Sequence, residues 1–302
     1  MKPSDPSPTS LLSAHSTVYL AGHPDYKALI PLEAEALSAD ILAFWAPVKT
    51  FAWRSLSPLS LFPSWLRWFE AKIMPGMLLH MQLRKRQIEH WVLAAHKEAP
   101  IEQLLILGAG LDTLGWRWAL ESPLTRVIEV DIPSTQNVKA LGLQKNHKPE
   151  NLSWISADLG SETWAAVIAR IPAWNPKART LIIAEGLFMH IAFARVETLI
   201  SDCLSEESST LIFSFKESDA DSPHESHKSS ALLSPWGLES SIEGSLWSKS
   251  LESLQAWLKE QRLVMVHKAS GKDMQRQFQK FALKPLKTAE GEMLICCQRA
   301  PY

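Results

Sequence analysis

The sequence contains few cysteines, and their spacing excludes a small protein held together by disulfides or zinc. There are three, Cys203, Cys296 and Cys297, an odd number with two of them adjacent inside an apolar run. Disulfide frameworks use an even set, and zinc sites use ligand pairs separated by a few residues. We therefore expect no metal centre. Thiols of this kind are typical of the reducing cytoplasm, where we expect the protein to reside.

The sequence also lacks strong net charge and long apolar runs. Its net charge of −1 gives no basis for binding nucleic acid or an acidic membrane surface. No apolar run approaches the ~20 residues that a membrane span requires. The first ten residues lack the apolar core of a signal peptide, and their composition predicts a disordered tail. With 302 residues, 46% of them hydrophobic, the chain can instead build a large core.

A β-α-β unit at residues 103–131 is the strongest pattern in the chain. An apolar run enters a turn at Gly108 and Gly110, a helical stretch of about ten residues follows, and a second apolar run ends at Asp131. Glycines in such a turn let the backbone approach a ligand, and a carboxylate at the tip of the next strand accepts hydrogen bonds from ribose hydroxyls. The unit therefore predicts a site for a nucleoside.

The third glycine of the dinucleotide pattern GxGxxG is missing, because Thr113 occupies its place. Dinucleotide sites use that glycine for close packing of the helix against the strand. Asp112 adds a negative side chain at the helix N-terminus, where a pyrophosphate would otherwise bind. Both features favour S-adenosylmethionine over a nicotinamide dinucleotide. A nicotinamide-dependent oxidoreductase and a non-catalytic cofactor-binding relative stay open as alternatives.

Strands and helices alternate after this unit, which indicates an α/β fold, a parallel sheet with helices on both faces. We expect strands at 152–156, 180–184, 210–215, 263–267 and 292–298, and helices at 133–145, 161–171, 193–204 and 250–260. Ligands of such sheets lie outside the carboxyl ends of the strands. Gly108, Asp131, Asp158 and Glu185 all stand at those ends. The sequence therefore predicts one site that contains all four residues.

Residues 77–97 favour one long helix with a single apolar stripe. Arg84 falls on that stripe, where an unpaired guanidinium would be costly. We therefore expect a carboxylate partner for Arg84, supplied either by the protein or by a ligand. Lys85 and Arg86 fall off the stripe, and we expect them on a solvated face.

A helical cap is expected to precede the core. Residues 1–100 are assigned to the tail and this cap, with two helical pieces within 11–43, and residues 101–302 to the core. The segment 44–81 is apolar, rich in tryptophan and interrupted by prolines. It either packs on the core as part of the cap or supplies aromatic walls to a pocket for an apolar substrate. A role at a membrane surface is the third interpretation, which the few and scattered basic residues disfavour.

Four motifs, in this order, resemble the leucine carboxyl methyltransferase family. They are Leu-Gly-Ala-Gly-Leu-Asp-Thr from residue 107, Glu-Val-Asp from 129, Ala-Asp-Leu from 157 and Glu-Gly-Leu-Phe-Met from 185. The family consists of class I S-adenosylmethionine-dependent methyltransferases, and the resemblance covers residues 77 to 215. It implies S-adenosylmethionine as the cofactor. It also implies a Rossmann-like, seven-stranded, mostly parallel sheet whose last strand is antiparallel, with an N-terminal helical cap.

The resemblance further implies roles for individual residues. Gly108 and Gly110 would frame the methionine part of the cofactor, and Asp131 would hold the ribose hydroxyls. Asp158 would meet the adenine amino group, and the backbone of Leu159 would meet the adenine ring.

Arg84 matches the arginine that binds the cofactor carboxylate in the family, and Glu185 matches its acid at the fourth strand tip.

The sequence departs from the family on the substrate side, at residues 20–22 and at Met189-His190. Because of these departures, the substrate is not inherited from the family name. We expect a small-molecule acceptor, which can be apolar or aromatic, to be methylated on a carboxylate or a hydroxyl. A carboxylate is already ionised at neutral pH, whereas a hydroxyl would benefit from a base, for which His190 is the first candidate. The sequence leaves the oligomeric state open.

Overall fold

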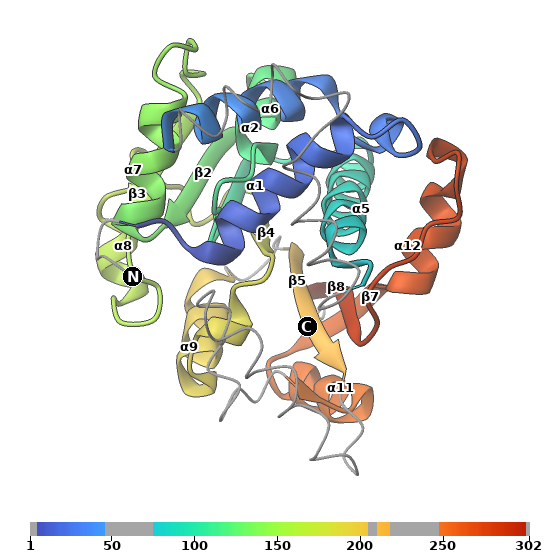
Figure 1. Ribbon diagram of the computed structural model, residues 1–302. Coiled ribbons are helices and arrows are strands. Elements are labelled where there is room, and N and C mark those ends of the chain that lie inside the picture. The colour runs from blue at the N-terminus through green and yellow to red at the C-terminus, as the bar shows by residue number, and fades with distance from the viewer. Residues whose placement is uncertain (1–4, 46–74, 205–209, 218–247, 300–302) are drawn as a thin grey trace.

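A central sheet with the strand order β3-β2-β1-β4-β5-β8-β7 runs through the molecule (Figure 1). The computed structural model describes residues 5–45, 75–204, 210–217 and 248–299. The strands are β1 (Gln103–Leu107), β2 (Arg126–Asp131), β3 (Leu152–Ser156), β4 (Thr180–Ala184), β5 (Thr210–Glu217), β7 (Leu263–Ser270) and β8 (Glu292–Arg299). A two-residue strand, β6 (Ser248–Lys249), also pairs with β5.

The directions of the strands place the edge at which a ligand would bind. Strands β1 to β5 are parallel to one another, whereas β8 runs antiparallel to both β5 and β7. The strand order reverses at β1, which lies between β2 and β4, and ligands of such sheets bind beside that reversal at the carboxyl ends. The predicted seven-stranded, mostly parallel sheet with an antiparallel last strand is confirmed, with β6 as a short addition.

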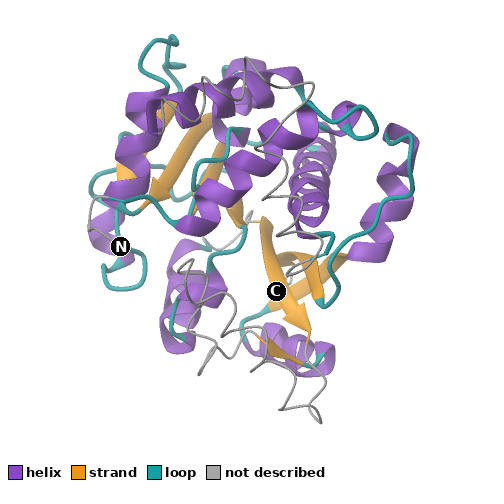
Figure 2. Cartoon of the chain, in the orientation of Figure 1, coloured by secondary structure: helices purple, strands orange, loops and turns teal. Residues whose placement is uncertain are grey.

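Helices cover both faces of the sheet (Figure 2). One face packs against α1 (Pro8–Ala21), α2 (Leu32–Trp45), α5 (Met77–Glu98), α6 (Leu114–Glu121), α7 (Pro133–Gly142) and α12 (Gly271–Phe278). The other packs against α8 (Trp164–Ile168), α9 (Phe193–Cys203) and α11 (Leu251–Glu260). Short 3-10 turns complete the described chain at Lys27–Leu29, Phe188–His190 and Gln279–Phe281.

The alternation of side chains along the strands explains this layering. In β1, Leu104 and Ile106 join the hydrophobic cluster of the first layer, whereas Leu105 and Leu107 join that of the second. Successive side chains of a strand point to opposite faces, so a strand buried on both faces is apolar throughout. The unbroken apolar run that marked β1 in the sequence follows from this double burial.

Several predicted bounds differ from those in the structure. The helix expected at 161–171 is shorter in the structure, where α8 spans only Trp164–Ile168. Helix α7 ends at Gly142 instead of Lys145. Helix α12 was not expected, although Ser270 and Asp273 form a capping box that marks its start. Residues 8–10 were predicted as part of a disordered tail but belong to α1, which begins at Pro8, a residue well suited to the first helical position.

Two expectations remain predictions. The tryptophan-rich segment falls largely at residues 46–74, outside the described part of the chain, and its role is therefore not placed. The division of the chain at residue 100 also stays a prediction. Across the described ranges, none of the helices combines the length and the apolar character needed to cross a membrane.

Candidate functional site

A cavity of about 290 Å³ lies at the carboxyl ends of β1 to β4, close to the lower end of the roughly 300–1,000 Å³ of small-molecule sites. Every residue that the sequence assigned to the site lines it: Arg84, Gly108, Gly110, Asp131, Asp158, Leu159, Glu185 and His190. These residues come from five separate segments of the chain. The fold therefore brings the predicted positions together, while their individual roles stay predictions.

The glycine turn after β1 requires its glycines. Gly108 and Gly110 have φ angles of 65° and 54°, in the left-handed region that other residues rarely adopt. A Cβ on Gly108 would also lie 2.9 Å from the Cδ1 atom of Leu187. The turn thus keeps its backbone exposed to the cavity where a side chain would fill it.

Asp131, at the end of β2, is bound to this turn. Its Oδ2 accepts a hydrogen bond from the Gly110 amide at 2.6 Å, and its Oδ1 accepts one from the Ile132 amide at 2.7 Å. Burial raises the pKa of Asp131, against these hydrogen bonds, which lower it. Because each carboxylate oxygen has two lone pairs, Asp131 retains acceptor capacity toward the cavity, as ribose binding would require.

The turn after β3 presents Asp158 and Leu159. Asp158 is exposed, and its carboxylate accepts hydrogen bonds from the Gly160 amide and the Ser161 hydroxyl, each at 2.9 Å. Leu159 is buried, and its carbonyl accepts a hydrogen bond from Nε of Arg195 at 2.9 Å. These contacts fix the shape of the turn at the cavity.

Arg84 finds its partners within the protein. Its Nε and one terminal nitrogen both lie 3.1 Å from Oε1 of Glu185, and its other terminal nitrogen pairs with Glu292. Burial alone would lower the pKa of Arg84, but Glu292 and Glu185 outweigh it and raise that pKa. The predicted need for a carboxylate partner is thereby met by two structural acids, and Arg84 still lines the cavity.

Glu292 was missed by the sequence analysis. It stands at the start of β8, whereas the acids that drew attention stand at the ends of strands. Burial favours its neutral form, yet the opposing effects of Arg84 and His80 lower its pKa to about 2. Burial instead raises the pKa of Glu185, despite the nearby charge of Arg84.

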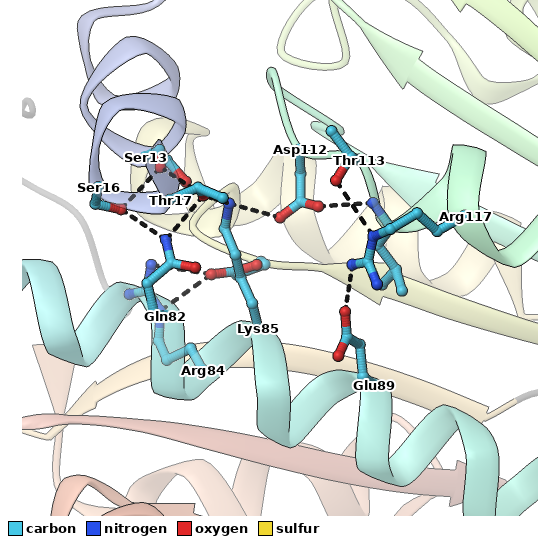
Figure 3. A network of polar contacts seen from close by, with 12 residues as sticks. Ser13, Ser16, Thr17, Gln82, Arg84, Lys85, Glu89, Asp112, Thr113 and Arg117 are labelled. Carbon is cyan, nitrogen blue, oxygen red and sulfur yellow. Dashed lines mark hydrogen bonds and ion pairs between the residues drawn. The ribbon is translucent and has the colours of Figure 1, made fainter. Parts of the chain in front are cut away.

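The expectation that Lys85 and Arg86 lie on a solvated face was wrong. The Lys85 side chain is only 13% exposed, and its Nζ lies 2.9 Å from Oδ2 of Asp112 (Figure 3). Arg86 is 29% exposed and pairs with Glu89 at 2.5 Å. Helix α1 covers this side of α5, because Gln82 donates to the hydroxyls of Ser16 and Thr17 at 2.6 and 3.0 Å.

Asp112 occupies the N-terminus of α6. Its Oδ1 accepts a hydrogen bond from the Leu114 amide at 2.7 Å, and its Oδ2 pairs with Lys85. Burial would raise the pKa of Asp112, but Lys85 and Arg117 outweigh this effect and lower it well below its usual range. The helix terminus that would bind a pyrophosphate in a dinucleotide site therefore already holds a negative charge.

Helix α1 and its N-cap residue supply further cavity residues that the sequence analysis did not identify. Ser7, Thr9, Ser10 and Ser13 line the cavity, and Cβ of Ser10 lies 3.3 Å from where a Cβ on Gly110 would stand. Part of the predicted tail thus belongs to the site. Its signal was the proline at the first helical position followed by an apolar pair, but nothing local placed this helix over the glycine turn.

His190 ends the 3-10 turn Phe188–His190 and lines the cavity. Its side chain is exposed at the rim, and partial desolvation lowers its pKa. The imidazole is therefore neutral at pH 7 and can accept a proton. Among the described residues, no group of three or more His, Cys, Asp or Glu is arranged to hold a metal ion.

The fold is the Rossmann-like α/β fold of class I methyltransferases. The chain is similar to the crystal structure of a "putative methyltransferase" from Thermobifida fusca YX, with a TM-score of 0.54, 17% identity and coverage of 99% of this chain and 96% of that one. A duf574 family protein from Streptomyces avermitilis MA-4680 gives a TM-score of 0.57 at 14% identity, covering 95% and 97%. At such identities the likeness shows the fold alone.

The resemblance to the leucine carboxyl methyltransferase family is confirmed, because the model of that family matches residues 56–203. Relatives from Mycobacterium marinum and Mycolicibacterium paratuberculosis are each named "Putative S-adenosyl-L-methionine-dependent methyltransferase". They are 29% and 31% identical over 133 and 134 residues, which cover 44% and 42% of this chain. The match spans 41% of the length of each of these relatives.

Proposed function

We propose that this chain is an S-adenosyl-L-methionine-dependent methyltransferase that methylates a carboxylate or hydroxyl oxygen of a small molecule. The observation that carries the proposal is the convergence of eight residues, predicted from separate motifs, on one cavity. The glycine turn and Asp131 suit a nucleoside, and the guanidinium of Arg84 suits a carboxylate. The proposed cofactor contains both groups in one molecule, joined through a sulfonium centre.

The charge around the glycine turn supports this cofactor over a nicotinamide dinucleotide. Oδ1 of Asp112 accepts a hydrogen bond from the Leu114 amide at 2.7 Å, at the helix terminus where a pyrophosphate would bind. A phosphate there would meet a carboxylate at close range, whereas the sulfonium and amino acid of the proposed cofactor carry no phosphate. The oxidoreductase alternative is therefore disfavoured on electrostatic grounds.

The proposed reaction needs positioning more than proton chemistry. The bound cofactor would supply a methyl group on sulfur, which the acceptor oxygen attacks in line as the carbon–sulfur electron pair passes to sulfur. The residues of the cavity hold the two reactants at near-attack distance. A carboxylate acceptor needs no base, whereas a hydroxyl acceptor would give its proton to the neutral imidazole of His190.

The proposal is tested in two steps. Calorimetry should give micromolar binding of S-adenosylhomocysteine and no comparable binding of NAD; the reverse would overturn the assignment. Small acids and phenols are then screened for uptake of a labelled methyl group. His190→Gln should slow methylation of a phenol and leave that of an acid unchanged. Cofactor binding without methyl uptake by any acceptor would favour the non-catalytic alternative.

A further inference from the structure

We propose that Glu292 is a positioning residue for the carboxylate of the cofactor, acting through Arg84. Arg84 and Glu185 line the cavity, whereas Glu292 contacts Arg84 from outside the lining. The inference rests on the proposed function, since it concerns the same cofactor. It adds a residue from the last strand, which lies beyond the residues 56–203 matched by the family.

The antiparallel direction of β8 explains how Glu292 reaches the site. The first residue of an antiparallel strand lies beside the last residues of its parallel neighbour. Glu292 accordingly pairs with Lys216 near the end of β5, and the Glu217 amide donates to the Gly291 carbonyl at 2.8 Å. Gly291 has a φ of 88°, which lets the chain turn into the strand at this edge. The carboxylate therefore arrives where the parallel strands end.

Both oxygens of Glu292 are engaged. Oε1 pairs with Arg84, and Oε2 lies 3.2 Å from Nε2 of His80, a fully buried residue one turn before Arg84 on α5. The imidazole thus fixes the carboxylate, and the carboxylate fixes the guanidinium from one side while Glu185 holds it from another. This arrangement sets the plane of the guanidinium before any ligand binds, which reduces the ordering cost of binding.

The guanidinium keeps donors for a ligand. Its Nε donates to Glu185, and its two terminal nitrogens form one ion pair each, with Glu185 and Glu292. Each terminal nitrogen carries two N–H groups, so each keeps one N–H beyond its ion pair, two in all. Two N–H groups are the number that a carboxylate binds in a bidentate pair. Because Glu292 holds Arg84 but does not reach the cavity, its loss should matter only to ligands that carry the carboxylate.

The test compares two ligands by calorimetry. S-adenosylhomocysteine carries the amino acid, and 5′-methylthioadenosine has the same adenosine and thioether without it. Glu292→Ala should weaken binding of the first by about tenfold and leave the second unchanged. Glu292→Gln should keep the affinity within about threefold, because the amide oxygen still accepts from Arg84. Glu290→Gln, at a side chain that is 83% exposed, is the matched control and should change neither.

Failure of the role of Glu292 and failure of the proposed function give different binding results. Equal weakening of both ligands by Glu292→Ala would assign a merely structural role and overturn the inference, as would unchanged binding of both. If Glu292→Ala lacks the native circular dichroism spectrum, Glu292→Asp replaces it, and its shorter side chain should weaken only S-adenosylhomocysteine. A wild-type protein that binds neither ligand would overturn the proposed function itself.

Discussion

Two buried ion-pair clusters lie against the cavity, and they differ in what they leave available. On β2, Glu129 pairs with Lys139 at 2.7 Å and accepts a hydrogen bond from the indole of Trp154 at 2.8 Å. The two charged side chains are 1% and 0% exposed. On the other side of β1, Arg84 pairs with Glu185 and Glu292, and these three side chains are 9%, 20% and 14% exposed.

We call Glu129 with Lys139 the closed cluster, and Arg84 with Glu185 and Glu292 the open cluster. Under the proposed function, the closed cluster is structural and the open cluster binds the cofactor. The charges of Glu129 and Lys139 are directed at one another, and such buried pairs are strongly destabilised when one partner is lost. Arg84 is held by two acids yet retains donors toward the cavity. Burial of a charge therefore does not by itself mark a functional residue, and the proposed binding role of Arg84 depends on its planar fork of donors beside the cavity.

The largest effect is expected at the closed cluster. Lys139→Met would leave Glu129 buried without its cation, so we expect the free energy of unfolding to fall by about 3–5 kcal/mol. Urea denaturation measures it, with Lys145→Met, at an exposed position, as the control. Combining Lys139→Met with Glu129→Leu should recover much of the loss, because it removes both charges. A loss below ~1 kcal/mol for the single variant would contradict the structural role.

Substitution of Arg84 in the open cluster should lower the affinity for the ligand. In Arg84→Lys, a single ammonium must replace a planar fork that contacts two acids, so S-adenosylhomocysteine should bind about 10- to 100-fold more weakly. Arg86→Lys is the matched control, since Arg86 pairs with Glu89 one turn away and should change binding by less than about threefold. Circular dichroism confirms the fold of both. Equal effects of the two substitutions would refute the assignment of Arg84.

Asp131 tests whether one side chain can belong to both types. It lies two residues after Glu129 on β2, and both residues line the cavity, but the Asp131 carboxylate accepts hydrogen bonds from the Gly110 and Ile132 amides instead of pairing with a buried lysine. Asp131→Ala should weaken S-adenosylhomocysteine by about tenfold or more and cost about 1–3 kcal/mol of stability. Asp131→Asn keeps an acceptor and should restore stability more than affinity. A lowered melting temperature with an unchanged dissociation constant would place Asp131 with the closed cluster.

The strand tips could be predicted because their signals are local. Gly108 and Asp131 each stand directly after an apolar run, and the alternation of elements sends both to the same edge of the sheet. Glu292 gives no such signal, since an acid before an apolar run suggests an exposed turn. Its place depends on the antiparallel pairing of β8 with β5, which joins residues far apart in the sequence.

The error at Lys85 has a related cause. Helical periodicity describes which face of α5 is apolar, but it does not say what covers the remaining surface. Helix α1 lies against that surface, with the Thr17 hydroxyl 3.5 Å from Nζ of Lys85. The polar face of α5 is thus buried by a polar contact, which a pattern of hydrophobic residues does not reveal.

The smallest expected effect is the pH dependence of stability, which should differ in sign between Glu292 and Glu129. The pKa of Glu292 falls from its usual 4.5 to about 2, against the effect of burial, because Arg84 and His80 favour the carboxylate. Glu292 therefore contributes stability above pH 4.5 that is lost as the pH falls toward 2. Burial instead raises the pKa of Glu129, so its stability contribution declines as the pH rises above its usual pKa.

The difference between wild type and Glu292→Gln isolates this contribution from those of all other carboxylates. One proton gives a slope of about 1.4 kcal/mol per pH unit at most. Urea denaturation between pH 2 and 4.5, the window set by the shifted and usual pKa of Glu292, should therefore show a steeper rise for the wild type. Above that window the two curves should run parallel, since the slope from Glu129 is common to both. Parallel curves throughout would mean that Arg84 and His80 do not stabilise the charge of Glu292, and the contrast between the clusters would lose its electrostatic basis.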